Sequence, residues 1–332
     1  IFCASALLAG LAQLLLLMLW ARRRGFVFHF QPVWKAPEVQ QLCQKILPGL
    51  LGAGVMQINS LVDRLLALHL GPAAVGALNY SQHLVYLPVG IFGVAMGVVC
   101  LPRMSRAMAR ADALEIASSL DYALRLILFL SLPCAALLFA LQEQTIMFLF
   151  ARGAFTVDAV RETSWALTFY VLGLPAFCCA KVATNPFHAR LDTATPVKIS
   201  LFCMLLNLVL NLILMQFLRQ GGLALSTSIC SWLNVGLLLS LNCRHLPQWS
   251  PRTLFRSGLP LLLLSLLAAL GASAAVKVLQ RPGLLPPGAP PLVQGALLLL
   301  LPAIAGGLIY LLGGLVSRRP ELRDFRQIIQ RR

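Results

Sequence analysis

The stretch that decides the fold is KILPGLLGAGVMQINSLVDRLLALHL, residues 45–70. It is long and apolar enough to cross a bilayer, because a helix rises about 1.5 Å per residue and roughly 20 residues span the hydrocarbon. Its polar side chains include Gln57, Asn59, Asp63 and Arg64. At about 100° per residue, Asn59 and Asp63 share one face and Arg64 falls on the opposite face. A charge in hydrocarbon costs at least ~2.5 kcal/mol, so this helix is predicted to lie between two polar regions. The alternative is that the charged groups of Asp63 and Arg64 lie among the lipid headgroups, while the aliphatic parts of the side chains pack on apolar surface.

The whole composition is that of a polytopic helical membrane protein. Of 332 residues, 59% are hydrophobic and 11% are charged, and the mean hydropathy is +0.82. No alternation of the kind that barrel strands need is visible, so the predicted fold class is all-α. Apolar runs of spanning length predict about nine transmembrane helices, at 1–20, 45–70, 78–101, 122–141, 163–185, 196–217, 222–241, 255–278 and 293–315.

The basic residues predict the orientation. The net charge of +16 would suggest nucleic acid in a soluble protein, but here it lies between apolar runs, so no nucleic-acid partner is expected. Of the 27 Lys and Arg residues, 20 lie in one set of connecting segments and five in the other. The richer set comprises 21–45, 102–121, 181–198, 242–256 and 316–332. By the positive-inside rule this side is cytoplasmic, and the C-terminus with it.

Motifs of catalysis are not visible in the sequence. It holds no Walker loop, no H-E-x-x-H and no G-x-S-x-G, and its nine cysteines show no C-x-x-C spacing. Neither an enzyme nor an ATP-driven pump is therefore expected. Polar residues inside the apolar runs favour a secondary transporter or a lipid-handling protein.

Two groups of such polar residues stand out. Asn79, His83 and Tyr86 share one face at the start of the third span, where a His is either a hydrogen-bonded structural group or a cation offered to an anionic substrate. Asn207 and Asn211 share a face of a later span. They either form hydrogen bonds between helices, which contribute about 0.6 kcal/mol each, or belong to a hard-cation site with Asp63.

Two connecting segments carry their own motifs. In FHARLDTATPVK, residues 187–198, Pro196 is suited to the first turn of a helix and Thr195 is the expected N-cap. Arg190 and Asp192 are expected to pair across this loop as a gate, the alternative being that they only shape the turn. The segment 142–162 on the other side is expected to be a long loop. Its LFARGAF, residues 149–155, should form a turn in which Gly153 permits a positive φ and Phe155 is buried beside the helix ends.

Four stretches resemble the MurJ/MviN family, the lipid II flippases of the MOP exporter superfamily. They are PGLLGAGVMQINSLVD (48–63), YSQHLVYLPVGIFGVAMGVVCLPRMSR (80–106), LFARGAF (149–155) and FHARLDTATPVK (187–198). In that family, fourteen helices form two six-helix lobes and a terminal pair that shapes a groove for the polyprenyl tail. The resemblance, which covers nearly the whole chain, implies the following parts: 1–20 as the last helix of a first lobe whose other helices are missing, 21–44 as a cytoplasmic linker, 45–245 as the second six-helix lobe, 246–316 as the terminal transmembrane pair, and 317–332 as a basic cytoplasmic tail.

The resemblance also implies a function. It is the flipping of lipid II, an undecaprenyl-diphosphate-linked precursor, from the inner to the outer leaflet of the bacterial cytoplasmic membrane by alternating access. No covalent chemistry and no cofactor are implied, and Na⁺ or the membrane potential is the expected driving force. Lipid II, membrane lipids and the cell wall synthesis machinery are the expected partners. Another MOP exporter, for drugs or a different polyprenyl glycan, and a non-transporting membrane scaffold remain the alternatives.

Residue by residue, the resemblance implies two sites. The family commonly reads Y-A-D-R-L where this chain has YSQHL at 80–84, so Gln82 replaces an Asp and His83 replaces an Arg implicated in holding the diphosphate. The expected substrate-binding residues are Arg64, Asn79, Gln82 and His83, with Arg64 compensating for the replaced Arg. The expected cation site, matching the sodium site known in some members, is Asp63, Asn207, Asn211 and Thr227.

Overall fold

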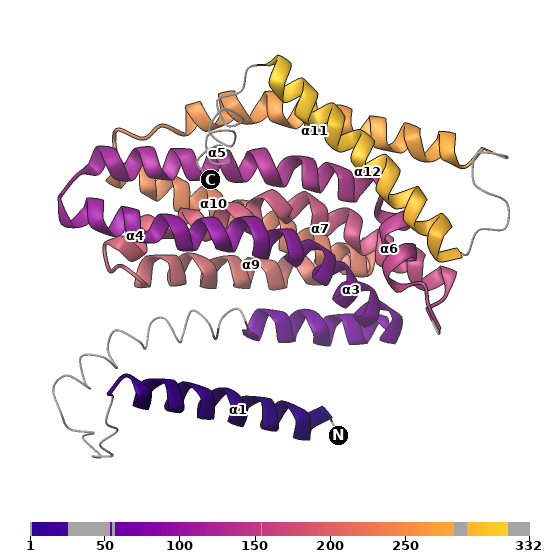
Figure 1. Cartoon of the computed structure of the whole chain (residues 1–332), viewed down its shortest axis with the longest axis horizontal. Helices are drawn as coiled ribbons and strands as arrows, with labels where there is room; N and C mark the ends of the chain where they lie inside the picture. Colours follow the sequence, from indigo (N-terminus) through magenta and orange to yellow (C-terminus); the bar gives the residue numbers. More distant parts are fainter. Residues whose placement is uncertain (1, 26–53, 55–56, 154, 282–290, 318–332) are drawn as a thin grey trace. The chain divides into compact units, whose positions relative to one another are not determined.

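The computed structural model describes residues 2–25, 54, 57–153, 155–281 and 291–317 (Figure 1). The chain divides into two compact units, Ile1–Leu47 and Pro48–Arg332. In the first unit, the helix α1 (Phe2–Arg23) corresponds to the span expected at 1–20. The linker expected at 21–44 lies outside the described residues from 26 onward, and the tail expected at 317–332 lies outside them from 318 onward.

The second unit is a helical bundle, and every regular element in its described part is a helix. Residues 57–70 are helical. The other elements are α3 (Pro72–Pro88), the π-helix η1 (Val89–Val94), α4 (Ala95–Ala109), α5 (Ala113–Ala140), α6 (Gln142–Phe150), α7 (Val157–Ala183), α8 (Asn185–Ala189), α9 (Ala194–Leu218), α10 (Gln220–His245), α11 (Pro251–Leu279) and α12 (Pro291–Val316).

The predicted membrane spans agree with these helices. Within the described residues, seven helical runs are long and apolar enough to cross a membrane. The seven spans expected between residues 78 and 315 each coincide with one of them, and only the end residues 141 and 255 lie outside. Of the stretch 45–70, the structure describes 57–70 and residue 54 as helical. The prediction of an all-α, multi-pass membrane protein is therefore confirmed.

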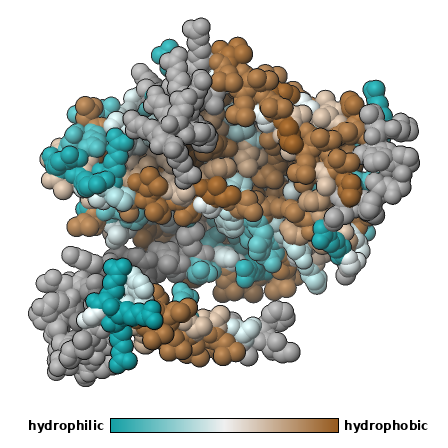
Figure 2. Space-filling view, in the orientation of Figure 1, coloured by the Kyte–Doolittle hydropathy of each residue, from teal (hydrophilic) through white to brown (hydrophobic). Residues whose placement is uncertain are grey.

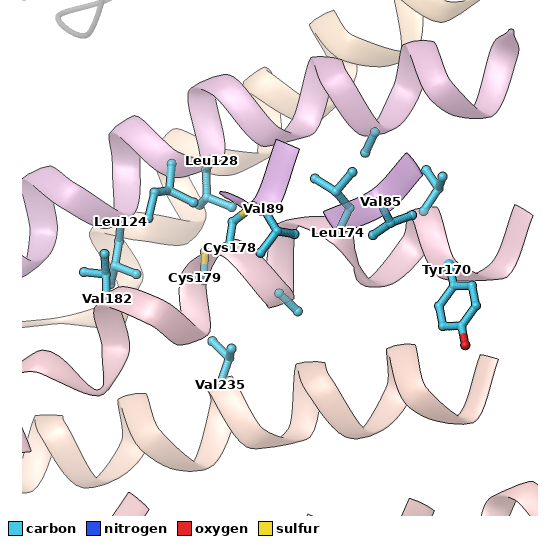
Figure 3. Packing of buried hydrophobic residues seen from close by; sticks show 14 of the residues in the cluster. Val85, Val89, Leu124, Leu128, Tyr170, Leu174, Cys178, Cys179, Val182 and Val235 are labelled. Atoms are coloured by element: carbon cyan, nitrogen blue, oxygen red, sulfur yellow. The ribbon is translucent and has the colours of Figure 1, made fainter. Parts of the chain in front are cut away.

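The core forms around α7. In the apolar window of this helix 67% of the residues are buried, against 44% or less in the other candidate spans. It packs against α3, α5 and α10. Figure 3 shows the inner layer, in which α7 side chains meet side chains of α3, η1, α5 and α10. The labelled residues are Val85, Val89, Leu124, Leu128, Tyr170, Leu174, Cys178, Cys179, Val182 and Val235. Because lipid is as apolar as leucine, close packing rather than exclusion from water holds such helices together.

Two glycines allow one backbone to approach α7 closely. A Cβ at Gly93 would lie 2.9 Å from Cys178 Cα, and a Cβ at Gly97 would lie 3.1 Å from the Lys181 carbonyl oxygen. The small-xxx-small spacing of Gly93 and Gly97 puts both on the same side of the helix, as in helix pairs with short interaxial distances. The Asn185 side chain then donates to the Gly97 carbonyl at 2.8 Å and fixes α8 beside α4.

The terminal pair packs onto the outside of this bundle. In Figure 1, α11 runs along α5, and α12 crosses α11 and reaches α6. The Tyr310 hydroxyl of α12 donates to the Phe129 carbonyl of α5 at 2.7 Å. The two helices therefore have their own contacts with α5, while the boundary expected at residue 246 stays a prediction.

The expectation of a long loop at 142–162 is wrong at both ends. Residues from Val157 onward belong to α7, and Gln142–Phe150 form the helix α6, in which four polar residues are followed by five apolar ones. The turn expected after it is confirmed, since Gly153 has a φ of +62°. Phe155 packs edge-on against the Tyr80 ring, with 5.2 Å between centroids.

Candidate functional site

One side of helix 57–70 buries a carboxylate. Asp63 is 6% exposed, and its Oδ1 accepts a hydrogen bond of 2.6 Å from the Asn211 amide of α9. Its Oδ2 accepts a longer bond, 3.4 Å, from Asn59 on the same helix. No Lys or Arg of the described residues lies at ion-pair distance from Asp63. Among the described residues, the buried side chain of Asp63 is therefore bonded to amide groups alone.

A network of hydrogen bonds leads from Asp63 into α9 and α10. Asn211 Nδ2 also lies 3.0 Å from Asn207 Oδ1, and the Ser226 hydroxyl donates to Asn211 Oδ1. Asn207 Nδ2 donates to Ser226 Oγ at 3.3 Å and to Thr227 Oγ1 at 3.5 Å. The structure thus brings together all four residues expected for the cation site. The network also contains Ser226, which was not expected from the sequence, where only its neighbour Thr227 was assigned to the cation site.

An open pocket also borders helix 57–70, and Asp63 and Arg64 both line it, so the expectation that they occupy opposite faces is wrong. Its volume is about 160 Å³, and it lies between helix 57–70 and α3. Its lining is formed by Ser60, Asp63, Arg64, Ala67, Val75, Leu78, Asn79 and Gln82. Three of the four residues expected to bind substrate therefore lie together, and Asp63 belongs to both the pocket and the buried network.

A hydrogen bond from α3 to α7 fixes the side chain of Gln82. Its Nε2 donates to the Tyr170 hydroxyl at 2.8 Å, and Tyr170 is buried in α7. Tyr170 is a supporting residue that the sequence analysis missed, since nothing in the linear spacing links positions 82 and 170. This bond leaves a second N–H and the amide oxygen of Gln82, which lines the pocket, for other partners.

His83 is the expected residue that the pocket leaves out. It is exposed, and its Nδ1 lies 2.7 Å from the Asn79 carbonyl oxygen one turn earlier. A carbonyl only accepts, so Nδ1 carries the hydrogen and donates, which leaves Nε2 directed away from the backbone. The imidazole therefore lies beside the pocket on the exposed face of α3, outside its lining.

The loop after α8 differs from its prediction. Thr195 is not the N-cap, because α9 begins at Ala194 and the Thr195 N–H donates to Asp192 Oδ1 at 3.0 Å. Pro196 does lie in the first turn, where a missing N–H costs no intrahelical bond. The expected Arg190–Asp192 pair is also wrong, since Arg190 Nη2 donates instead to the His245 carbonyl at 3.3 Å.

The charges of this loop follow from these partners. Burial lowers the pKa of the Arg190 guanidinium below its ordinary value, and the charge of Asp192 opposes that shift. Burial alone would raise the pKa of the Asp192 carboxyl. Hydrogen bonds from Thr195 and Ala194 outweigh it and hold that pKa below its usual range. Asp192 therefore acts as an ionised cap on the first turn of α9.

The family is decided by comparison with known proteins. A family model described as "Lipid II flippase MurJ" matches residues 2–285. The chain belongs to this family. The probable lipid II flippase MurJ of Vibrio cholerae is 36% identical to it over 231 residues, which cover 70% of this chain and 44% of that relative. The chain spans about half the length of the curated MurJ relatives that it matches.

Solved structures show the same fold. The inward closed conformation of the lipid II flippase MurJ matches with a TM-score of 0.70 at 23% identity, over 89% of this chain and 57% of that one. An outward-facing multidrug resistance transporter of the MATE family in the MOP superfamily matches with 0.54 at 16% identity, over 84% and 65%. The division of these helices into a six-helix lobe and a terminal pair, α11 and α12, stays a prediction.

Proposed function

We propose that this chain forms the second lobe and the terminal helix pair of a flippase that moves lipid II from the inner to the outer leaflet by alternating access. The observation that carries the proposal is the pocket beside helix 57–70, which places one guanidinium and two amides together in a family of lipid II flippases. No covalent bond changes in this function, so the site needs to bind and release, not to react.

The diphosphate of lipid II is the group that suits this pocket. Arg64 is exposed and keeps its charge at any physiological pH, and a guanidinium binds phosphate oxygens through two parallel hydrogen bonds. Asn79 lines the pocket beside it as a further hydrogen-bonding group. A volume of about 160 Å³ suits a phosphate-sized group, so the sugars and the peptide extend beyond this pocket.

Asp63 supplies the link to an ion. Its carboxylate borders the pocket and repels a diphosphate, while its other contacts are the amides and hydroxyls of α9 and α10. Carboxylate, amide and hydroxyl oxygens suit a hard cation such as Na⁺, and rotation of an Asn side chain exchanges its nitrogen for its oxygen. A cation held at Asp63 would cancel the repulsion. Substrate and Na⁺ therefore bind with positive coupling in this proposal.

The proposed orientation places the α4–α5 turn and the α8–α9 loop in the cytoplasm. The basic residues of these segments support it. A membrane-impermeant thiol reagent added to intact cells should label a cysteine placed at Arg152 and should not label one placed at Arg110. The reverse pattern would overturn the orientation.

The function itself is tested in cells. Depletion of the protein should reduce the lipid II that an externally added probe detects in the outer leaflet, while total lipid II rises. Restoring the protein should reverse the loss, and restoring an Arg64→Ala variant present at the same membrane level should not. Unchanged outer-leaflet lipid II on depletion would contradict the proposal and favour a different MOP substrate or a scaffold.

A further inference from the structure

A second polar hollow lies where α4 turns into α5. It is open, has a volume of about 550 Å³, and is lined by Arg103, Arg106, Ala109, Arg110 and Glu115. The three arginines follow one another at spacings of three and four residues, so they share a face of α4. Figure 2 shows hydrophilic side chains gathered at this end of the bundle, beside an apolar flank.

The positive charge of this hollow exceeds its negative charge. Glu115 forms ion pairs with two arginines, at 2.8 Å from Arg110 Nη2 and 3.4 Å from Arg103 Nε. Both arginine side chains stay largely exposed, at 66% and 56%. Arg106 is exposed and has no carboxylate at ion-pair distance among the described residues. The nearby Asp112 is engaged as the cap of α5, where it accepts from the Glu115 N–H at 2.9 Å.

The hollow also lies at a defined depth. Val98 and Val99 of α4 are 66% and 68% exposed, as expected of side chains that face lipid tails. Arg106 follows Val99 by seven residues, which at about 1.5 Å per residue is roughly 10 Å along the helix. The headgroup layer begins within that distance of the hydrocarbon edge. A phospholipid whose tails lie against these valines can therefore place its phosphate at the arginines.

We infer that the hollow at the α4–α5 turn binds the phosphate of an acidic membrane lipid. Arg106 is the primary ligand because no carboxylate competes for it, and Arg103 and Arg110 add donors that they share with Glu115. Free inorganic phosphate has the same chemistry, but only a lipid combines the phosphate with tails for the exposed valines. This site is separate from the pocket at Arg64 and does not depend on the transported substrate.

The test is the binding of phosphatidylglycerol and phosphatidylcholine to the purified chain in detergent, counted by native mass spectrometry. Arg106→Gln should lower phosphatidylglycerol binding about fivefold, the change that one basic residue near an anionic surface gives. Arg106→Lys should retain most of the binding. Glu115→Gln should raise it, because two arginines are released from their carboxylate. Arg256→Gln, which removes an exposed arginine of α11 outside the hollow, is the matched control and should change nothing.

Three outcomes would overturn the inference. The first is equal binding of both lipids to the unaltered chain. The second is an equal loss in Arg106→Gln and Arg256→Gln, which would indicate general surface charge. The third is displacement of phosphatidylglycerol by millimolar inorganic phosphate but not by chloride at equal ionic strength, which would assign the hollow to a free anion. An unchanged unfolding midpoint shows that each variant keeps its fold.

Discussion

Asp63 and Arg64 are neighbours in the sequence and both line the pocket beside helix 57–70, yet their side chains differ in burial and in partners. Asp63 is buried and bonded to amides, and its hydrogen bonds lead through α9 into α10. Arg64 is exposed and borders the pocket with Asn79 and Gln82. The helical rotation of 100° per residue turns Asp63 toward α9 and leaves Arg64 exposed. Helix 57–70 thus carries one residue whose hydrogen bonds are satisfied internally and, next to it, one whose hydrogen-bonding capacity is left for a ligand.

This difference predicts which substitutions affect folding and which affect binding. Where polar groups are buried and bonded to one another, removing one leaves its partners unsatisfied. Where they are exposed, water replaces the lost partner and the fold is little changed. The substitutions below change the buried residues and the exposed pocket residues separately.

The largest effect is expected at Asn211. Replacing it by Ala removes the 2.6 Å bond to Asp63 and leaves a buried carboxylate with only the longer bond from Asn59. A bond to a charged group contributes about 1.5–3 kcal/mol, so the free energy of unfolding should fall by that amount in detergent. Thr227→Val, which removes only a 3.5 Å contact, is the control and should cost about 0.6 kcal/mol. Equal losses would show that Asp63 is not the centre of the network.

Arg64→Ala should act on binding instead. Losing one charge-assisted bond should weaken lipid II binding by roughly 1.5–3 kcal/mol, with the unfolding midpoint unchanged. Binding of purified variants to lipid II measures this. Arg152→Ala, which removes an arginine of the loop after α6, should bind like the unaltered chain. Full lipid II binding by Arg64→Ala would remove the pocket from the substrate path.

Asp192 offers a contrast with Asp63, because its carboxylate caps a helix end outside the membrane-spanning segments. Its pKa is lower in the folded chain than the ordinary 3.8, so its contribution is full above that value and is lost as the pH falls through the lowered pKa. Asp192→Ala should destabilise the chain by about 0.5–2 kcal/mol at pH 7 and by less in strong acid.

The double variant Arg190→Asp with Asp192→Arg tests whether the two side chains interact directly. The two residues have separate partners, so the double variant should not recover what the single variants lose. Thermal unfolding of all four chains measures the coupling. Recovery in the double variant would restore the direct pair that the sequence suggested.

The smallest effect is expected at His83, which lies beside the pocket. His83→Arg should retain or increase lipid II binding, because a guanidinium is always charged and binds phosphate oxygens through two parallel hydrogen bonds. His83→Ala should weaken binding by about 0.2–1 kcal/mol, the range for an exposed pair. Lipid II binding by the purified variants measures this. An effect of His83→Ala larger than that of Arg64→Ala would reverse their ranking.

The sequence predicted the parts of this molecule that depend on local pattern. Hydropathy located the spans, and helical spacing grouped Asn207 with Asn211. The sequence placed Arg64 on the face opposite Asp63, whereas both residues line one pocket. It also missed what depends on how helices meet. Ser226 faces α9 beside the expected Thr227, and Tyr170 reaches Gln82 across 88 positions of the chain. It also misjudged the loop after α8, because Arg190 finds its acceptor at the end of α10.

The most direct test of this difference between Asp63 and Arg64 is a sodium titration of Asp63→Asn and Arg64→Gln, read by thermal unfolding and by lipid II binding, with potassium at equal ionic strength as the control. Sodium should raise the unfolding midpoint of the unaltered chain and of Arg64→Gln, and should not raise that of Asp63→Asn. Lipid II binding should fall in Arg64→Gln, whereas in Asp63→Asn it should persist and no longer depend on sodium. Loss of the sodium response in Arg64→Gln, or its retention in Asp63→Asn, would contradict the account.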